Sequence, residues 1–519
     1  MANDQRYYDV IGFGDEVAGV LALVCAAREY RRRTKKYARV LLMSKSSLGQ
    51  GIGGHLVRGG LAYLDRGQID RNLRLSLGLD PFGDPPAIYK EFLRKAGVIS
   101  IALDPRKADA ALRQMLREAG IDLLSNVEIN SVVKEGQKLV SLVTPMGIYS
   151  GKHFIDSTVN AELAQAAGVR KLKGFETFGL PESELPVTLV FETQGLSVRR
   201  VKELDFAYLK RFTNLGDTEG QRLLLHAAGF DIKLAEQLRN DMVDSQGNLK
   251  TLWAGSDYID IRSLALSASY HSFRGKKLSF SQTNFIFDKG NVAILAGDRL
   301  SWNAVLFGVN GSQAEALARG RAKPTPKMLE EITFVEKWLK SFGATSVTPA
   351  SELYIRHAGN VTGVVEPLTG SAMLMGGVSP REALGTFAYH FDVRGGIPGI
   401  GTKASTLGFS SVTFPAPVFN IGIQHALIKD VPNLAVVSPA SGFEGYASSA
   451  GRIVEFNVAV GQGVGIAAII ALLSGRNLAN ISNLEVRKVL DETGQCPRIF
   501  GIPQAEIASR LEQFESLIA

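Results

Sequence analysis

Two arginines and three histidines are the residues of this sequence best suited to act on a small molecule. Arg356 and Arg452 stay charged at physiological pH and can bind a carboxylate through two parallel hydrogen bonds, so each is a candidate anchor for an anionic substrate. His55, His357 and His390 are candidate acid–base groups, although a lone histidine is more often structural. Their chemistry depends on elements that bring them to one site.

The segment "YYDVIGFGDEVAGVLALVCAAREY", residues 7–30, predicts a buried strand, a glycine turn and a helix. Residues 8–13 are mostly apolar without alternation, as in a strand buried on both faces of a parallel sheet. From Val17 onward, apolar residues recur at helical spacing. The turn between them is similar to the G-x-G-x-x-G motif, whose glycines make the turn, admit a pyrophosphate and allow close helix packing.

The glycine motif is incomplete in either register. Read from Gly14 to Gly19, its middle position holds Glu16; read from Gly12, its last glycine is Val17. A carboxylate at position 16 would repel phosphate oxygens unless it turns away or a cation intervenes. A plain strand–turn–helix therefore stays open as the alternative. The residues expected here to contact a dinucleotide are Gly12, Gly14, Glu16, Ala18 and Gly19.

A second buried strand, residues 38–46, is followed by the glycine-rich segment 47–65. So many glycines cost backbone entropy, which a fold tolerates where the chain must pass close to something. We expect a loop that contacts the cofactor through Gly53 and Gly54, with His55 and Arg58 facing the cofactor or the substrate. A glycine-rich surface loop is the alternative.

The segment 431–477 predicts a buried strand, a small-residue loop and a helix with Gly461, Gly465 and Ala468 on one side. A glycine face permits close approach to a flat ring or to another helix. The amides at the N-terminal end of such a helix can stabilise an anion, including the pyrimidine side of a reduced isoalloxazine.

Composition sets outer bounds. The chain has 519 residues, 45% hydrophobic content and a net charge of +7, which describes a soluble globular protein and does not indicate nucleic-acid binding. Two cysteines exclude a cysteine metal cluster and suit a reducing compartment, and no metal site is expected. The polar N-terminus favours a cytoplasmic protein. The apolar segment 454–473 is interrupted by polar residues and glycines, which favours a buried helix over a membrane span.

The order of elements predicts an α/β fold with a doubly wound nucleotide domain and an inserted domain. After βαβ come a helix over 104–124, hairpins turning at Gly136 and Gly147, and a closing strand over 152–158. From about residue 176, strands such as "PVTLVFET" and "KLSFSQTNFIF" mix with long polar helices, notably 327–342. We expect a nucleotide domain built from 1–175 and 415–519, and a substrate domain over 176–414.

Four blocks of the sequence resemble FAD-dependent oxidoreductases of the glutathione-reductase-like superfamily, most closely the xanthan-lyase-like FAD proteins. Besides the first turn they are "KHFIDSTVNAELAQAAGV", "ELYIRHAGNVTGVVEPLTG" with the following "GTFAYHFDVRGG", and "RIVEFNVAVGQGVGIAA". The resemblance implies a Rossmann-like two-domain flavoprotein, bound FAD, a small-molecule substrate, and Thr158 among the cofactor contacts. It also implies that Arg356 and Arg452 would balance a reduced flavin.

The sequence departs from the family at several expected contacts. The acidic residue that binds the adenosine ribose is replaced by Ser44, followed by Lys45, a pair able to take the 2′-phosphate of NADP. The A-T-G glycine is Val159 and the acid after it is Asn160. In the third block the charged positions after Arg356 become His357 and Gly359, and Asp392 is kept while the final histidine becomes Arg394.

Three functions follow, in order of preference. The first is an FAD-dependent oxidoreductase in which a substrate passes hydride to flavin while a positioned base takes a proton. The second is a degenerate flavoprotein fold that binds or assembles without redox turnover, because a fold alone does not establish function. The third is NADP(H), in place of FAD, at the first turn. The sequence does not indicate the substrate, the electron acceptor or the oligomeric state.

Overall fold

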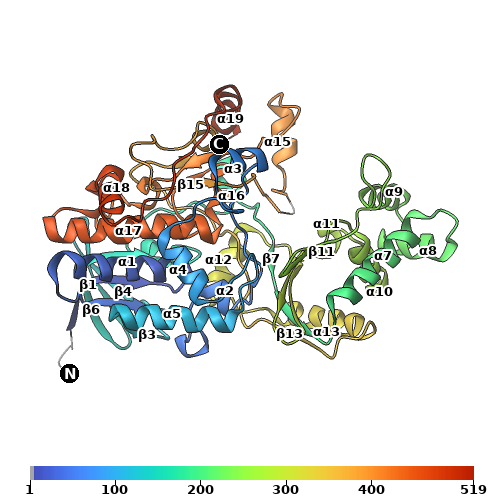
Figure 1. Ribbon diagram of the computed structural model, residues 1–519, viewed down its shortest axis with the longest axis horizontal. Coiled ribbons are helices and arrows are strands. Elements are labelled where there is room, and N and C mark those ends of the chain that lie inside the picture. Colours follow the sequence, from blue (N-terminus) through green and yellow to red (C-terminus); the bar gives the residue numbers. More distant parts are fainter. Residues whose placement is uncertain (1–4, 395, 519) are drawn as a thin grey trace.

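The computed structural model describes residues 5–394 and 396–518 and contains two seven-stranded sheets, each in its own half of the molecule (Figure 1). The first sheet has the order β3-β2-β1-β6-β5-β4, with β17 beside β6. Its strands are β1 (Gln5–Phe13), β2 (Val40–Met43), β3 (Asp122–Leu124), β4 (Ser131–Glu135), β5 (Lys138–Thr144), β6 (Gly147–Asp156) and β17 (Leu434–Val436).

The far edge of β6 joins distant parts of the chain. Its first residues pair with β5 in the antiparallel sense, and residues 154–156 pair with β17 in the parallel sense. A strand near residue 435 thereby extends a sheet that starts at residue 5, as expected if both ends of the chain form one Rossmann-like unit.

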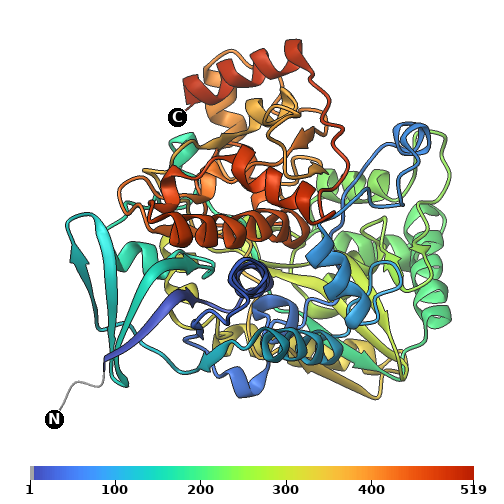
Figure 2. The same ribbon diagram turned by 60° about the vertical axis from the view of Figure 1, so that its left-hand side comes forward.

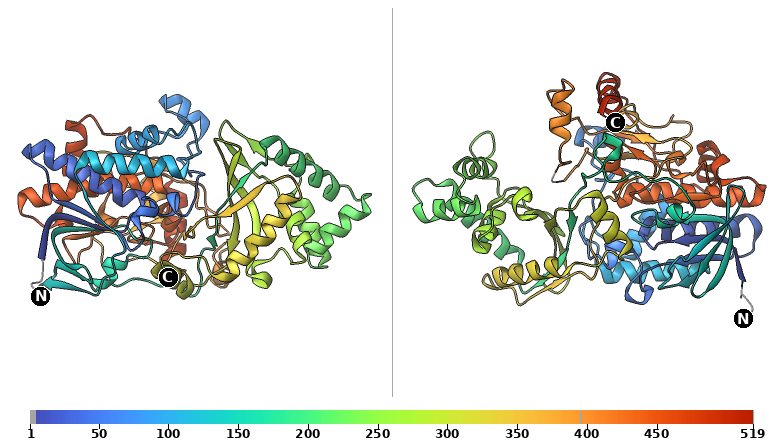
Figure 3. Two further views of the ribbon diagram at one scale, coloured as in Figure 1. Left: turned by 90° about the horizontal axis from the view of Figure 1, so that it is seen from below. Right: turned by 180° about the vertical axis from the view of Figure 1, so that it is seen from behind.

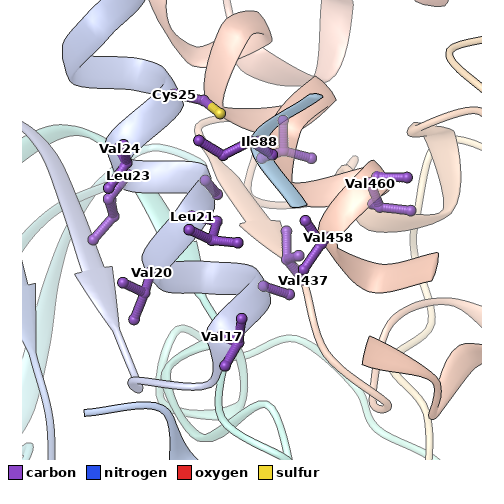
Figure 4. Packing of buried hydrophobic residues seen from close by; sticks show 14 of the residues in the cluster. Val17, Val20, Leu21, Leu23, Val24, Cys25, Ile88, Val437, Val458 and Val460 are labelled. Carbon is purple, nitrogen blue, oxygen red and sulfur yellow. The ribbon is translucent and has the colours of Figure 1, made fainter. Parts of the chain in front are cut away.

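Helices cover this sheet in layers. α1 (Val17–Thr34) lies between the sheet and α17 (Val454–Ser474), and side chains from both helices interdigitate, with Leu21 and Val458 among them (Figure 4). The other helices of this half are α2 (Gly54–Val57), α3 (Arg71–Leu77), α4 (Ala87–Lys95), α5 (Pro105–Ala119), α6 (Glu162–Ala166), α16 (Ala447–Gly451) and α18 (Asn483–Glu492).

α17 is the one helix of the described residues long and apolar enough to cross a membrane, and its most apolar window is 89% buried inside the molecule. Because α1 packs on one side and α4 and α18 also contact it, the helix is apolar all round, as a central core helix must be. The expectation of a buried helix is confirmed.

Local signals place several elements correctly. The Asp104 side chain accepts a hydrogen bond from the Arg106 amide and starts α5, and Gly120, with φ of +70°, ends it. The segment 277–287 is only partly the strand that its sequence suggests. Residues 280–283 form helix α11 (Phe280–Thr283), and Asn284, with φ of +61°, separates it from the strand that begins at Phe285.

The second sheet is antiparallel, in the order β13-β8-β12-β11-β10-β9, with β7 beside β12. Its strands are β7 (Val187–Thr188), β8 (Phe191–Gln194), β9 (Trp253–Ala254), β10 (Tyr258–Asp260), β11 (Phe285–Leu295), β12 (Arg299–Phe307) and β13 (Ser346–Pro349). One face packs on helix α13 through a core that includes Phe191, Trp302 and Trp338. The helices here are α7 (Val198–Thr213), α8 (Thr218–Ala227), α9 (Ile232–Asp241), α10 (Ala265–Arg274), α12 (Gly311–Arg319) and α13 (Pro326–Lys340).

The C-terminal helix α19 (Ala505–Ile518) packs above the first half, over α14 (Gly370–Leu374) (Figure 2). The two sheets lie side by side along the long axis of the molecule (Figure 3). The remaining elements are strands β14 (Leu368–Thr369), β15 (Thr386–Ala388), β16 (Val418–Asn420) and β18 (Phe443–Glu444), and helix α15 (Ile400–Thr406).

Candidate functional site

The first turn is occupied by a carboxylate of its own. Asp15 Oδ2 accepts hydrogen bonds from the amides of Gly53 at 3.1 Å and Gly54 at 3.4 Å, and from Arg58 Nη1 at 2.5 Å. Its Oδ1 accepts from Ser44 Oγ at 2.8 Å and from Arg58 Nη2 at 2.9 Å. Amides of the glycine loop and the hydroxyl at the end of β2 therefore converge on Asp15.

Arg58 is the centre of this network. Its side chain is 3% exposed, and its Nε donates to Glu352 Oε1 at 2.8 Å while both Nη atoms bind Asp15. Burial by itself would raise the pKa of the Asp15 carboxyl, but the Arg58 guanidinium, together with hydrogen bonds from Ser44 and the Gly53 amide, outweighs burial and lowers that pKa. For Glu352, burial prevails over Arg58 and raises the pKa. One guanidinium thus holds two buried carboxylates, which we call the Arg58 network.

Glu16 turns toward the glycine loop. Its Oε1 accepts the amide of His55 at 3.2 Å, and its Oε2 lies 2.5 Å from His55 Nδ1. A Cβ at Gly54 would lie 2.1 Å from Glu16 Oε1, and the φ of +50° at this position also favours glycine. The glycine loop therefore provides a partner for each oxygen of the Glu16 carboxylate, namely the amide and the ring of His55.

Planar side chains stack beside the turn. The rings of His55 and Tyr354 are stacked with centroids 4.9 Å apart, and Arg356 lies on Tyr354, 4.5 Å from the ring centre. Arg356 is fully buried and donates to the Pro186 carbonyl at 2.7 Å and to Asn303 Oδ1 at 3.3 Å. Burial lowers the pKa of Arg356 to about 10, and among the described residues it has no carboxylate within ion-pair distance.

Arg452, just before α17, reaches the same stack. It pairs with Asp392, and its Nη1 donates to the Tyr354 hydroxyl at 3.3 Å. Burial would lower the pKa of Arg452, but Asp392 and its neighbours raise it well above the usual value. Among the residues that the structure describes, His55 Nε2 and Arg452 Nε have no hydrogen-bond partner. Both residues line a void of about 10 Å³, which is about the space of one water molecule.

Polar groups after β2 and in the loop after β6 also have partners within the chain. Lys45 Nζ lies 2.8 Å from Glu162 and 3.2 Å from Glu128, so two carboxylates compensate its charge. The hydroxyl and amide of Thr158 both donate to Asp156. Lys45 is thus not a free cation for a 2′-phosphate in this arrangement.

The glycine face of α17 packs on a helix. A Cβ at Gly461 would lie 2.6 Å from the Ala18 carbonyl oxygen, and one at Gly465 would lie 2.2 Å from that of Ala22. Of the two partners considered for this face, a flat ring and another helix, the structure places the helix. The role of Ala18, Gly461 and Gly465 as cofactor contacts stays a prediction, while their packing between α1 and α17 is observed.

Packing also explains the glycines of the first turn. A Cβ on any of them would lie within 2.7 Å of an atom of α1 or of the loop after β6. These atoms are Leu23 Cδ1 for Gly12, the Thr158 nitrogen for Gly14, and Ser157 Oγ for Gly19. The turn therefore keeps the close strand–helix contact of a dinucleotide motif, and atoms of α1 and of the loop after β6 lie against its glycines.

Two of the candidate histidines lie outside the stack. His357 is fully buried between Glu184 and Asn360, with Nδ1 and Nε2 each 2.8 Å from an oxygen, and it stacks on Phe175. Burial opposes its protonation, but Glu184 outweighs burial and raises the pKa of His357. This environment is that of a structural histidine.

His390 lies near the surface. Its Nδ1 is 2.5 Å from Gln68 Oε1, and its ring stacks on Tyr389. The structure thus brings together His55, Arg356 and Arg452, and leaves His357 and His390 with other partners.

The sequence profile of a family described as "FAD dependent oxidoreductase" matches residues 9–490. The chain belongs to this family. Similar solved structures include L-proline dehydrogenase from P. horikoshii, with 10% identity, TM-score 0.35, and coverage of 93% of this chain and 99% of that one. The myxobacterial chondrochloren halogenase CndH has 12% identity and TM-score 0.36, covering 94% and 79%. The amino acid oxidase NikD of nikkomycin biosynthesis has 10% identity and TM-score 0.35, covering 88% and 94%. No curated protein matches the sequence.

Membership of the FAD-dependent oxidoreductases confirms the family-level resemblance and implies FAD. The residues present do not fit it in this arrangement. Asp15 and Glu16 of the first turn accept hydrogen bonds from the amides of Gly53, Gly54 and His55, in the glycine loop that is expected to contact the cofactor. The expected contact residues are also buried by the chain itself, namely Gly12, Gly14, Ser44, Gly53 and Gly54. A cleft for a dinucleotide would leave its lining accessible.

Sequence reasoning missed three residues of this site. Asp15 stands beside Glu16 in the turn, and two adjacent acids in a phosphate-type turn were the available signal for a buried cation. Glu352 and Tyr354 flank the expected Arg356, but their pairing with residues 46–58 is a long-range contact that leaves no local pattern.

Proposed function

We propose that this chain is a binding protein on the FAD-dependent oxidoreductase fold, in which internal ion pairs replace the contacts to FAD and hydride transfer is lost. The observation that carries the proposal is the Arg58 network. Asp15 occupies the amides of Gly53 and Gly54, and Arg58 and Ser44 hold it there in a buried position.

Electrostatics also supports the proposed loss of FAD binding. A diphosphate entering the turn would approach the carboxylates of Asp15 and Glu16, and the nearest guanidinium is already shared between Asp15 and Glu352. Displacing Asp15 would also break charge-assisted hydrogen bonds in a buried setting, where they are strongest.

The alternative is the family reaction, in which FAD accepts hydride from a small molecule. Arg356 favours it, because a buried arginine with no carboxylate partner among the described residues suits an anionic ligand. The unpartnered His55 Nε2 and Arg452 Nε point the same way. In that case His55 would be the residue placed to exchange a proton.

Flavin binding separates the two functions. Protein purified under native conditions is denatured and its supernatant checked for flavin absorbance, and the native chain is titrated into FAD while flavin fluorescence is followed. We expect no bound flavin and no quenching. A yellow protein with stoichiometric, photoreducible FAD would refute the proposal and establish the oxidoreductase.

A double variant tests whether the carboxylates of the first turn prevent FAD binding. Asp15→Ala with Glu16→Ala removes both carboxylates and leaves Arg58 paired with Glu352, so the buried charges stay balanced. We expect this variant to bind FAD more tightly than the unaltered chain. The matched control is Glu203→Ala with Glu219→Ala, which removes two exposed carboxylates elsewhere and should not change FAD binding.

A further inference from the structure

The second sheet carries a polar grid on the face opposite its core. In the register of β13, β8 and β12, Ser346, Gln194 and Arg299 form one row, and Thr348, Glu192 and Ser301 form the next. Directly paired residues of antiparallel strands point to the same face, so all six share one side. The alternate residues of these strands, such as Val347 and Leu300, belong to the core beneath α13. We call the six residues the polar grid.

A cleft of about 400 Å³ is lined by all residues of the polar grid except Arg299. Its opposite wall comes from the glycine loop and the start of α5, through Gln50, Val57, Arg58, Pro105 and Arg106. The volume falls within the usual range for small-molecule sites. Because the walls belong to separate halves, the cleft also has the location that ligand sites favour.

Charges in the walls are already compensated. Arg58 is held by Asp15 and Glu352. On the sheet side, Glu192 lies 2.8 Å from Arg299 and 3.8 Å from Arg106. Arg106 is 75% exposed and therefore stays largely in solvent. The less exposed charges of the described walls are paired with each other and an anion would meet Glu192, which favours a neutral ligand.

Neutral hydrogen-bonding groups remain free. The side chains of Gln50, Gln194, Ser346 and Thr348 make no hydrogen bond to another described residue. Amides and hydroxyls can both donate and accept, which matches ligand hydroxyl groups. The apolar surfaces between them, from Val57, Val190, Pro105 and Pro349, suit the C–H faces of a sugar ring.

We propose that this cleft binds an uncharged polyhydroxylated molecule, a carbohydrate of one or two rings. The inference rests on the binding role proposed above and names its ligand class. Its test is independent of FAD, because none of the four free side chains belongs to the Arg58 network.

The test is calorimetric titration of the full-length protein with maltose, cellobiose, xylobiose and mannobiose, alongside glucuronic acid and glucose 6-phosphate. We expect at least one neutral disaccharide to bind and both acids to fail. Binding of none of the neutral sugars, or of the acids alone, overturns the proposal. Sugar binding is measured separately from flavin binding, so failure of one proposal is distinguishable from failure of the other.

A double variant, Ser346→Val with Thr348→Val, removes two hydroxyls while β-branched side chains keep the strand. Loss of two hydrogen bonds should weaken binding roughly tenfold to a hundredfold. The control is Thr333→Val, an exposed threonine on α13 away from the cleft, which should bind as the unaltered chain does. Unchanged affinity in a double variant with an unaltered thermal transition would contradict the placement of the ligand on the polar grid.

Discussion

Substitution of Arg58 by methionine tests the Arg58 network directly. Methionine keeps much of the apolar stem and removes the guanidinium, which leaves Asp15 and Glu352 as buried carboxylates without their cation. Removing one partner of a buried ion pair costs about 3–5 kcal/mol, because the remaining charge stays desolvated. Since this arginine serves two carboxylates, we expect a loss of free energy of unfolding at the upper end of that range, measured by urea denaturation followed by circular dichroism at pH 7.

The pH dependence of this loss has a definite sign. In the variant, burial without a cation raises the pKa of both carboxyls above their unfolded values near 4. A raised carboxyl pKa gives stability that is present at low pH and is lost as pH rises through the folded pKa. The deficit of Arg58→Met relative to the unaltered chain should therefore shrink between pH 7 and pH 5. Adding Asp15→Asn and Glu352→Gln should recover most of the loss at pH 7.

Arg106→Met is the matched control. Arg106 is mostly exposed and lies 3.8 Å from Glu192, so its loss should change the free energy of unfolding by less than about 0.5 kcal/mol. If Arg58→Met were as stable as Arg106→Met, or if its deficit did not change with pH, the carboxylates would not depend on Arg58. The first turn would then be open to phosphate groups and the argument against FAD would fail.

Three further results are expected. Gly465→Val should destabilise the chain by about 1–3 kcal/mol or more in urea denaturation, because its Cβ meets the Ala22 carbonyl at 2.2 Å, whereas Gly401→Ala, with open space around it, should be near neutral. Burial lowers the pKa of His425 to about 3 and of His153 to about 4, so the unfolded chain binds protons before the folded chain does as pH falls below about 6.5. The urea midpoint should therefore drop as pH falls from about 6.5 to about 4, and His153→Gln should reduce the drop. Burial raises the pKa of Glu515 to about 7, so the stability that Glu515 contributes should decline as pH rises from its unfolded pKa near 4.5 to about 7. The decline should appear as faster proteolysis of α19 at the higher pH, and Glu515→Gln should remove this pH dependence.

Much of the first half of the fold is visible in the sequence because its signals are local. The apolar run before Gly14 gives β1, helical spacing from Val17 gives α1, and the cap at Asp104 and the stop at Gly120 give α5. The strand prediction for 277–287 fails before Phe285, because a short helix and the left-handed residue Asn284 interrupt a segment whose composition favours a strand.

The candidate site is only partly visible in the sequence, for a physical reason. Glycines permit close approach, but their positions do not say what approaches. Gly54 accommodates the Glu16 carboxylate, and Gly465 accommodates the α1 backbone. The deciding partners lie far away in the chain, as Arg58 and Glu352 do, and no local pattern reports such pairs.

The acids of the first turn then have one physical explanation. The amides of Gly53, Gly54 and His55 lie where the glycine loop enters α2, and buried amides need acceptors. Asp15 and Glu16 supply the anion from within, and Arg58 and His55 supply the groups that a carboxylate requires in a buried place. The residue that departs most from the dinucleotide motif, Glu16, thus joins the first turn to the glycine loop through His55.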